Sequence, residues 1–222
     1  MTASDAGGRR NFTVAVTGHR PNRLTLGDDA LRRKLQTVLR ALRSGADGRA
    51  HVAVSALAEG ADRMFAEAAL TLGYTLHALL PFPRDAYETT FSDPSETPAY
   101  QALLARAQAI RELPFTLDDT KAAYEAVGQA TVDTADILVA VWDGEPAAGR
   151  GGTPEIIGYA RARGLPVIWV DARRLTLPRH ITPPSCSGRN TIPLATAKSR
   201  AQPLTRRRIV KLAKMVATRQ RP

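Results

Sequence analysis

The chain contains a single cysteine, Cys186, and no apolar run long enough to cross a bilayer. One thiol excludes a disulfide within the chain and argues against a zinc site built on cysteine. The N-terminal residues 1–10 are polar and have no apolar stretch of the kind found in signal peptides. From these absences we expect a cytoplasmic protein of bacterial type, without a bound metal and without a transmembrane segment.

Acidic residues are absent from the last part of the chain. Residues 172–222 contain 13 Lys or Arg and no Asp or Glu, so this segment accounts for the net charge of +10. We predict a flexible N-terminus at 1–11, a folded domain at 12–171 and a basic, Pro-containing, partly disordered extension at 172–222 with one short helix. The extension is either solvated or binds nucleic acid or an acidic surface, with an anionic membrane as a minor option. It has no aromatic residue, which argues against base stacking.

Within 12–171, strand-like and helix-like patterns alternate, which predicts an α/β, Rossmann-like domain. Its sheet is expected to be mostly parallel, with helices on both faces. The stretch 81–98 is Pro-rich and polar, and we expect a long loop there, either a lid or a surface excursion. Apolar runs predict strands at 12–17, 51–55, 74–80, 110–114, 136–142 and 166–170. Helical spacing predicts helices at about 28–43, 61–72, 98–109, 119–134 and 153–163.

A strand at 137–142 is followed by a glycine-containing loop and a helix start. Thr153 is expected to be the N-cap and Pro154 the first helical residue. Glycines allow close backbone approach, and the N–H groups at a helix start bind anions. We therefore predict that Gly151, Gly152 and Thr153 hold a phosphate group, as in a nucleotide site.

Two further loops should leave the sheet at the same edge and complete one pocket. In the first, at 17–23, Thr17, Gly18, His19 and Arg20 suit a ribose or a phosphate, although His19 and Arg20 could instead cap the strand or pair with carboxylates. In the second, at 55–63, an acidic residue in the first helical turn would repel phosphate. We expect that loop to contact sugar or base, or to serve turn geometry.

Several well-known signatures are missing. No G-x-G-x-x-G follows the first strand and no Walker sequence is present, which argues against NAD-dependent hydride transfer and P-loop chemistry. There is also no G-x-S-x-G elbow and no H-E-x-x-H helix.

Six motifs occur in order: VTGHRP, SALAEGADR, LPFPRDAYE, YEAVGQ, ADILVAVWDG and GGTPEI. Together they resemble the SLOG superfamily, the Rossmann-like group that includes Smf/DprA and the LOG phosphoribohydrolases. Ser55, Ala58, Gly60 and Asp62 match the DprA-type pattern S-G-x-A-x-G-x-D. The last motif is similar to the LOG-type loop P-G-G-x-G-T-x-x-E, without its Pro-Gly-Gly opening.

Two departures bear on activity. The resemblance to LOG enzymes implies a catalytic glutamate three residues after the motif's threonine, and this chain has Ile156 there. Glu155 comes one residue earlier, a rotation of about 100° on a helix. Glu59 stands where DprA-like motifs carry an arginine, which makes that loop less suited to single-stranded DNA.

The resemblance implies a module that senses a nucleotide or NAD-derived ligand in bacterial signalling or defence, with no required cofactor. It also implies self-association. One alternative is cleavage of an N-glycosidic bond by Glu155 or Asp143, with Arg20 or Arg84 orienting the phosphate. A second is DprA-like binding of nucleic acid through the basic extension. The candidate ligand-binding residues are Thr17, Gly18, His19, Arg20, Ser55, Glu59, Gly60, Asp62, Arg84, Asp143, Gly144, Gly151, Gly152, Thr153 and Glu155.

Overall fold

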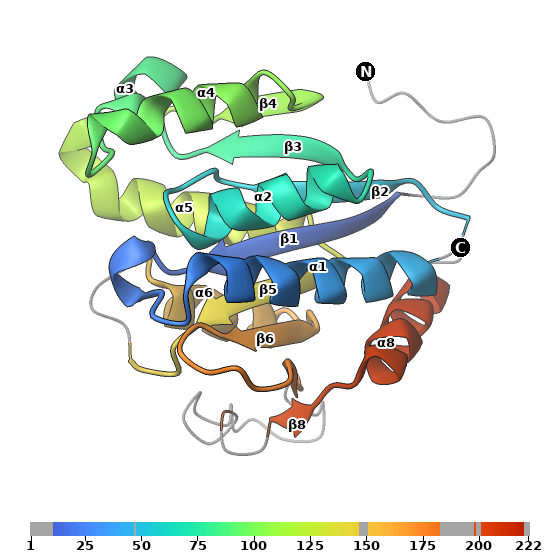
Figure 1. Cartoon of the computed structure of the whole chain (residues 1–222). Helices are drawn as coiled ribbons and strands as arrows, with labels where there is room; N and C mark the ends of the chain where they lie inside the picture. Colours follow the sequence, from blue (N-terminus) through green and yellow to red (C-terminus); the bar gives the residue numbers. More distant parts are fainter. Residues whose placement is uncertain (1–10, 47, 147–150, 183–197, 199–200, 220–222) are drawn as a thin grey trace.

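One eight-stranded sheet runs through the protein, which we describe from a computed structural model (Figure 1). The structure describes residues 11–46, 48–146, 151–182, 198 and 201–219. The strand order is β4-β3-β2-β1-β5-β6-β7-β8; the pairings from β4 to β6 are parallel, and β7 and β8 are antiparallel to their neighbours. The strands are β1 (Phe12–Gly18), β2 (His51–Ser55), β3 (Thr75–Leu80), β4 (Ala109–Glu112), β5 (Ile137–Trp142), β6 (Val167–Asp171), β7 (Arg179–Ile181) and β8 (Gln202–Pro203).

Helices cover both faces of the sheet, as the sequence predicts. On one face lie α1 (Asp28–Gly45), α2 (Ala61–Thr71), α4 (Thr97–Leu104) and α8 (Arg206–Arg219). On the other lie α5 (Thr120–Asp133) and α6 (Thr153–Ala162). The described residues also form the short α3 (Arg84–Glu88) and the 3-10 turns η1 (Pro21–Arg23), η2 (Pro94–Glu96) and η3 (Leu117–Asp119). None of the described helices is long and apolar enough to span a membrane.

The central strands are apolar on both faces because each face is covered. In β1, Val14 and Val16 belong to the core on the α1 and α2 side, whereas Ala15 belongs to the core on the α5 and α6 side. In β5, Val139 and Ala140 divide in the same way. This two-residue alternation is the side-chain period of a strand, and it explains why both segments read as continuous apolar runs.

The strand order reverses between β1 and β5. From β1 the chain continues to β2 on one side, and from β5 it continues to β6 on the other. The carboxyl ends of both strands therefore open onto the same crevice, where ligands bind in open α/β sheets. The predicted fold class, with its mostly parallel sheet, is confirmed.

The stretch 81–98 differs from the long loop that its composition predicts. It contains α3 and η2, and its aromatic side chains join a buried cluster. Tyr87 and Tyr100 are fully buried, with ring centroids 5.7 Å apart, and the rings of Tyr87 and Phe91 lie 5.3 Å apart. Burial of aromatic rings holds this segment against the domain. It is a packed excursion within the described residues.

Two element boundaries also shift from their predicted positions. The helix expected at 98–109 ends at Leu104, because the N–H of Gln108 already bonds to the carbonyl of Leu76 on the way into β4. At the start of α6 the N-cap is Gly152, with Thr153 as the first helical residue. The hydroxyl expected to cap this helix is therefore turned to another partner.

The described part of 172–222 continues the domain beyond the boundary expected at 171. Strand β7 extends the sheet, and α8 packs against α1 with Ile209 and Ala213 at most 1% exposed. The two helices approach closely: a Cβ atom on Gly45 would lie 2.5 Å from that of Ala213. The predictions of a flexible 1–11 and of disorder in the extension fall largely on 1–10, 183–197, 199–200 and 220–222, outside the described residues, as does Cys186.

The packing of α8 on α1 can be tested with two substitutions on the same helix. Ile209→Ala removes a buried side chain, and we expect the free energy of unfolding to fall by about 3 kcal/mol in urea titrations. Met215→Ala, on the exposed side, should change it by no more than about 0.5 kcal/mol. Equal effects of the two substitutions would contradict the packing described.

Candidate functional site

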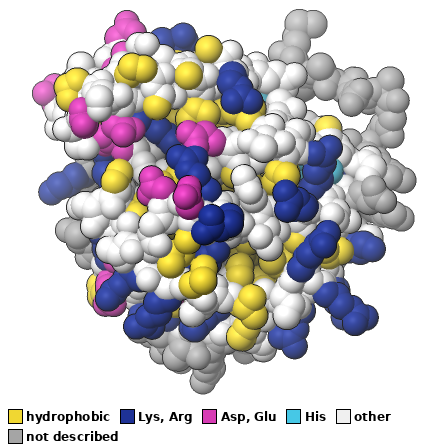
Figure 2. Space-filling model, viewed as in Figure 1, with side chains coloured by type: hydrophobic (Ala, Val, Ile, Leu, Met, Phe, Trp, Pro, Cys, Tyr) yellow, Lys and Arg dark blue, Asp and Glu magenta, His cyan; other side chains and the backbone are white. Residues whose placement is uncertain are grey.

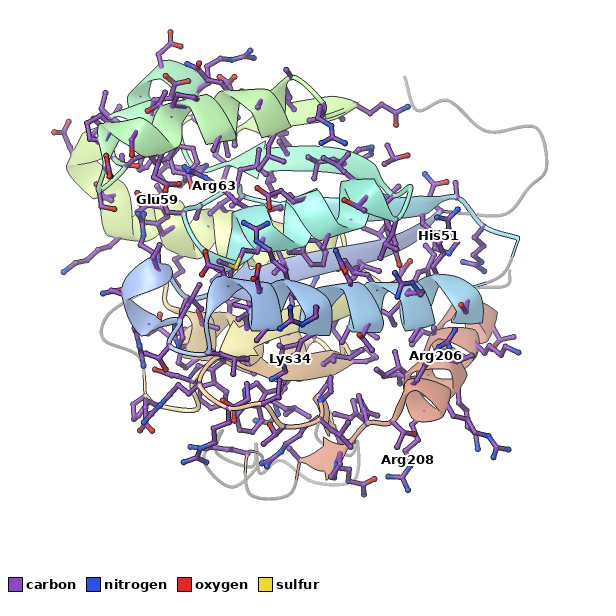
Figure 3. The ribbon with its side chains drawn as sticks, viewed as in Figure 1. Lys34, His51, Glu59, Arg63, Arg206 and Arg208 are labelled. Atoms are coloured by element: carbon purple, nitrogen blue, oxygen red, sulfur yellow. The ribbon has the colours of Figure 1, made fainter. Side chains whose placement is uncertain are left out.

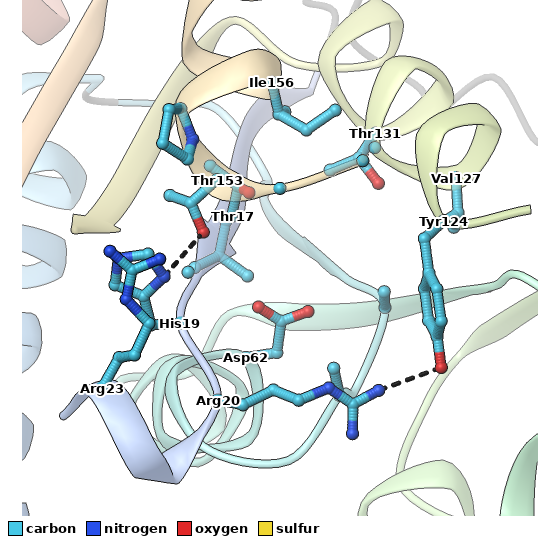
Figure 4. A pocket seen from close by; sticks show the side chains of 18 of the residues that line it. Thr17, His19, Arg20, Arg23, Asp62, Tyr124, Val127, Thr131, Thr153 and Ile156 are labelled. Atoms are coloured by element: carbon cyan, nitrogen blue, oxygen red, sulfur yellow. Dashed lines mark hydrogen bonds between the residues drawn. The ribbon is translucent and has the colours of Figure 1, made fainter. Parts of the chain in front are cut away.

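A pocket of about 330 Å³ opens at the carboxyl ends of β1 and β5 (Figure 4). This volume falls within the range of sites for small organic ligands. The loop after β1, the loop after β2, the start of α6 and one face of α5 form its walls. The lining residues are Val16, Thr17, Gly18, His19, Arg20, Asn22, Arg23, Ala56, Ala58, Asp62, Tyr87, Tyr124, Val127, Gly128, Thr131, Gly151, Gly152, Thr153, Pro154 and Ile156.

At one end of the pocket, α6 begins without a side-chain cap from any residue that the structure describes. Gly151 has a φ of +77°, and a Cβ atom there would lie 2.9 Å from the backbone nitrogen of Glu125, so glycine lets this turn lie against α5. The N–H of Gly151 donates to the Glu155 carboxylate. Among the described residues we find no acceptor for the N–H groups of Gly152 and Thr153. These groups and the helix dipole favour an anion at this end.

Beside this helix start, three side chains form a chain of hydrogen bonds, which we name the Asp143–His19–Thr153 relay. The Nε2 atom of His19 lies 2.9 Å from Oδ1 of Asp143, and its Nδ1 atom lies 3.4 Å from Oγ1 of Thr153. Arg23 donates to the other carboxylate oxygen of Asp143 from Nε at 2.8 Å and from a terminal nitrogen at 2.7 Å. Figure 4 shows His19 and Thr153 facing each other at the pocket wall.

Burial and hydrogen bonding set the charges of this relay. Burial lowers the pKa of His19 and outweighs the opposing hydrogen bond and charge of Asp143, so the imidazole is neutral at pH 7. Burial alone would raise the pKa of Asp143, but hydrogen bonds from the Glu145 N–H, His19 and Arg23 lower it overall. Asp143 is therefore ionised.

At the other end, Arg20 bridges two elements that are distant in sequence. It donates to the Glu59 carboxylate and, over 2.9 Å, to the hydroxyl of Tyr124 on α5. Glu59 is 1% exposed, and its second oxygen accepts from the N–H and hydroxyl of Ser92 at 2.8 and 2.7 Å. Glu59 thus compensates the charge of Arg20 and anchors the segment after α3.

Asp62 lies between these two ends, on the floor of the pocket (Figure 4). It is 6% exposed, and burial raises its pKa to about 7, against the lowering effect of the Ala58 N–H, the Arg20 charge and the Ala56 N–H. A carboxyl group that titrates near neutrality can accept or donate a hydrogen bond, depending on pH.

The loop at 55–60 is shaped to support the pocket from behind. The buried Ser55 hydroxyl accepts from the Leu57 N–H and donates to the Asp62 carbonyl, both over 3.1 Å. Gly60 has a φ of +89°, and a Cβ atom there would lie 2.8 Å from the His19 carbonyl oxygen. That carbonyl accepts the N–H of Ala61, so the start of α2 is already occupied by backbone. The start of α2 is therefore filled by backbone, whereas α6 has no side-chain cap from the described residues.

The structure sorts the predicted site residues into three groups. Lining the pocket are Thr17, Gly18, His19, Arg20, Asp62, Gly151, Gly152 and Thr153. Directly behind its walls are Ser55, Glu59, Gly60 and Asp143, which hold lining residues in place. Turned to other partners are Arg84, which pairs with Glu112; Gly144, whose carbonyl accepts from Lys198; and Glu155, which is exposed and bonds to Gly151.

Several lining residues were not among the predicted ones: Tyr87, Tyr124, Val127, Gly128, Thr131 and Ile156. Four of them lie on α5. One of these, Gly128, leaves room for Ile156, since a Cβ atom on Gly128 would lie 2.4 Å from the Cδ1 atom of Ile156. The signal available in the sequence was a glycine inside a predicted helix. Glycine destabilises a helix interior, and it is expected there where close packing requires it. Within the described residues no cluster of three or more His, Cys, Asp or Glu side chains could hold a metal ion.

The raised pKa of Asp62 makes stability depend on pH in a defined direction. The folded protein retains this proton up to about pH 7, whereas the unfolded chain releases it near pH 4. The contribution of Asp62 to the free energy of unfolding therefore falls as the pH rises from about 4 to about 7. In urea titrations, the free energy of unfolding of Asp62→Asn should rise relative to that of the wild type as the pH increases across this window, by up to about 1.4 kcal/mol per pH unit. The exposed Asp118→Asn is the control, and a difference between Asp62→Asn and wild type that does not change with pH would refute the assignment.

Comparisons with protein-family models and with curated proteins give no match. Among solved structures, DNA processing protein A (DprA) from Streptococcus pneumoniae aligns with a TM-score of 0.55 and 16% identity, covering 92% of this chain and 62% of the DprA chain. This chain thus matches less than two thirds of the DprA chain. TM1055, a structural genomics target, aligns with a TM-score of 0.44 and 17% identity over 70% of this chain and 72% of its own. The alignment with DprA shows the fold alone, and this is the Rossmann-like α/β fold that the sequence predicts.

Proposed function

We propose that the pocket binds a nucleotide or a nucleotide-derived molecule and that the protein acts as a sensing module. The observation that carries this proposal is the uncapped start of α6 inside a pocket at the point where the strand order reverses. A helix start in that position is a general anion site. The phosphate would bind at Gly152 and Thr153, opposite Thr17.

The opposite wall suits a sugar and a base. Tyr124, Val127 and Ile156 offer apolar surface along α5 and α6, and Gly128 leaves room for Ile156. Asp62 offers a carboxyl group to hydroxyl or amino groups of the ligand. A mostly apolar pocket with a few directed polar groups is the usual pattern for such ligands.

The pairing of the pocket arginines supports recognition by the helix start. Arg20 is engaged by Glu59 and Arg23 by Asp143. Each guanidinium is therefore largely compensated before a ligand arrives, and breaking either pair would leave a nearly buried carboxylate behind. Backbone N–H groups and the dipole of α6 supply positive potential without that cost.

Binding without turnover fits the geometry better than N-glycosidic cleavage. Ile156 faces the pocket at the position where LOG-like enzymes carry the catalytic glutamate. Glu155 is exposed and bonds to the Gly151 N–H, while both oxygens of Asp143 are held by His19 and Arg23. Neither carboxylate is placed to stabilise an oxocarbenium-like centre in the pocket.

The proposal can be tested by titration calorimetry with AMP and adenosine. We expect AMP to bind more tightly than adenosine, and Thr153→Val to weaken AMP binding about 10- to 100-fold, because a hydrogen bond to a charged group is lost. Arg84→Ala, an exposed change outside the pocket, should leave the affinity for AMP unaltered. Equal binding of AMP and adenosine would contradict the phosphate site. Release of free adenine during incubation would show turnover and exclude a purely sensing role.

A second candidate function is binding of nucleic acid by the outer surface of α8. Figure 2 shows Lys and Arg side chains at the lower right, where Figure 1 places α8 and the C-terminal end of α1. Arg206 and Arg208, labelled in Figure 3, are exposed residues of α8. The structural neighbour DprA is a DNA processing protein, which agrees with this candidate. The exposed cations of α8 are Arg206, Arg207, Arg208, Lys211 and Lys214.

Because α8 is anchored to α1, these cations form a fixed surface, and its contribution can be measured. We expect binding of a single-stranded oligonucleotide to weaken with salt. Substituting Gln for Arg206, Arg207, Lys211 and Lys214 together should reduce the slope of log K against log salt by about 0.7 for each phosphate that the variant no longer neutralises. Arg111→Gln, on the opposite edge strand, is the matched control. A salt-independent affinity would exclude this function.

A further inference from the structure

The Asp143–His19–Thr153 relay fixes where its protons lie. The ionised carboxylate of Asp143 can only accept hydrogen bonds. The Nε2 atom of His19, 2.9 Å away, must therefore carry a proton. A neutral imidazole has one N–H, so Nδ1 is left as an acceptor.

This assignment also determines the direction of the hydrogen bond made by the Thr153 hydroxyl. Its hydroxyl lies 3.4 Å from Nδ1 of His19 and donates its one proton to that nitrogen. Only oxygen lone pairs then face the pocket, at the start of α6. Thr153 is 5% exposed, so water has little access to compensate. A fully ionised phosphate also offers only acceptors, and two sets of lone pairs oppose each other.

We propose that His19 determines which ligands the pocket accepts, by making the binding of a dianion conditional on the uptake of one proton. When the imidazole carries a proton on Nδ1 as well, that nitrogen donates to Thr153 Oγ1. The hydroxyl is then released to donate its own proton to the bound anion. No bond other than these hydrogen bonds changes. This inference rests on the proposed phosphate site at α6.

The surrounding charges agree with this exchange. Protonated His19 would stand between Asp143 and the bound dianion, and these two negative charges would act against the charge of Arg23, which lowers the pKa of His19. Opposite charges on both sides favour the imidazolium, so a bound dianion raises the pKa of His19 from its lowered value in the empty pocket. In the neutral state Thr153 instead suits a ligand that offers a hydroxyl or amino hydrogen.

Asp62 and Arg20 are the other charged residues among those that line the pocket. Asp62 titrates near neutrality and could itself gain a proton when an anion binds. A test must therefore separate the proton of His19 from the proton of Asp62. Arg20 keeps its charge throughout the pH range of interest.

Sulfate is the appropriate probe, because it remains a dianion between pH 5.5 and pH 8, roughly the range in which phosphate esters titrate. Calorimetry in two buffers of different ionisation enthalpy gives the number of protons taken up per sulfate. We expect about one. The affinity should rise as the pH falls, by up to about tenfold per pH unit, between the pKa of His19 in the bound and in the empty protein.

Two variants identify the group that takes up the proton. His19→Gln keeps an N–H for Asp143 and an oxygen for Thr153 but cannot gain a proton, so sulfate binding should be weaker and the uptake should be lost. Asp62→Asn should retain the uptake. Loss of uptake in Asp62→Asn together with its retention in His19→Gln would assign the proton to Asp62 and overturn the proposal.

Nitrogen-15 NMR of the wild-type histidines provides a test that does not depend on the stability of either variant. The four histidines are His19, His51, His77 and His180. For His19 we expect a proton on Nε2 alone in the empty protein and on both nitrogens with sulfate bound. A proton on Nδ1 alone in the empty protein, or sulfate binding without proton uptake, overturns the role of His19 only. Absence of binding by both sulfate and AMP at every pH overturns the phosphate site itself.

Discussion

The parallel pairing of β1 with β5 is the contact on which the rest of the structure depends. It runs from Val14 opposite Ile137 to Gly18 opposite Val141, and the N–H of His19 continues it by bonding to the Val141 carbonyl. The pairing joins the two halves of the sheet and aligns two strand ends that are more than a hundred residues apart in sequence. The crevice, the relay and the start of α6 all take their positions from this alignment.

Much of the sheet was predictable because its central strands are buried on both faces and therefore appear in the sequence as continuous apolar runs. The start of α6 was predictable for a similar local reason: glycines and a proline mark it within a few residues. The pocket wall formed by α5 was not predictable. The apolar spacing around Val127 shows which face of the helix is buried, but it does not show which part of the protein that face contacts. Contacts such as Glu59 with Ser92 depend on how distant segments fold together.

Charge compensation within the site changes the meaning of its arginines. In sequence, Arg20 stands beside a strand end and is a natural phosphate ligand. In the structure it is held between Glu59 and Tyr124, and the equally placed Arg23 is held by Asp143. The acidic partners lie far along the chain, so no local pattern reveals them. The pocket is consequently less cationic than its composition indicates.

Helix α8 completes a core that begins with α1, although about 160 residues separate Gly45 from Arg206. Until α8 has been synthesised, the side of α1 that it covers at Gly45 is open. A nascent chain that already contains the complete pocket would still expose apolar surface to the cellular environment. Burial of this surface of α1 therefore waits for α8, which is synthesised after every residue that lines the pocket.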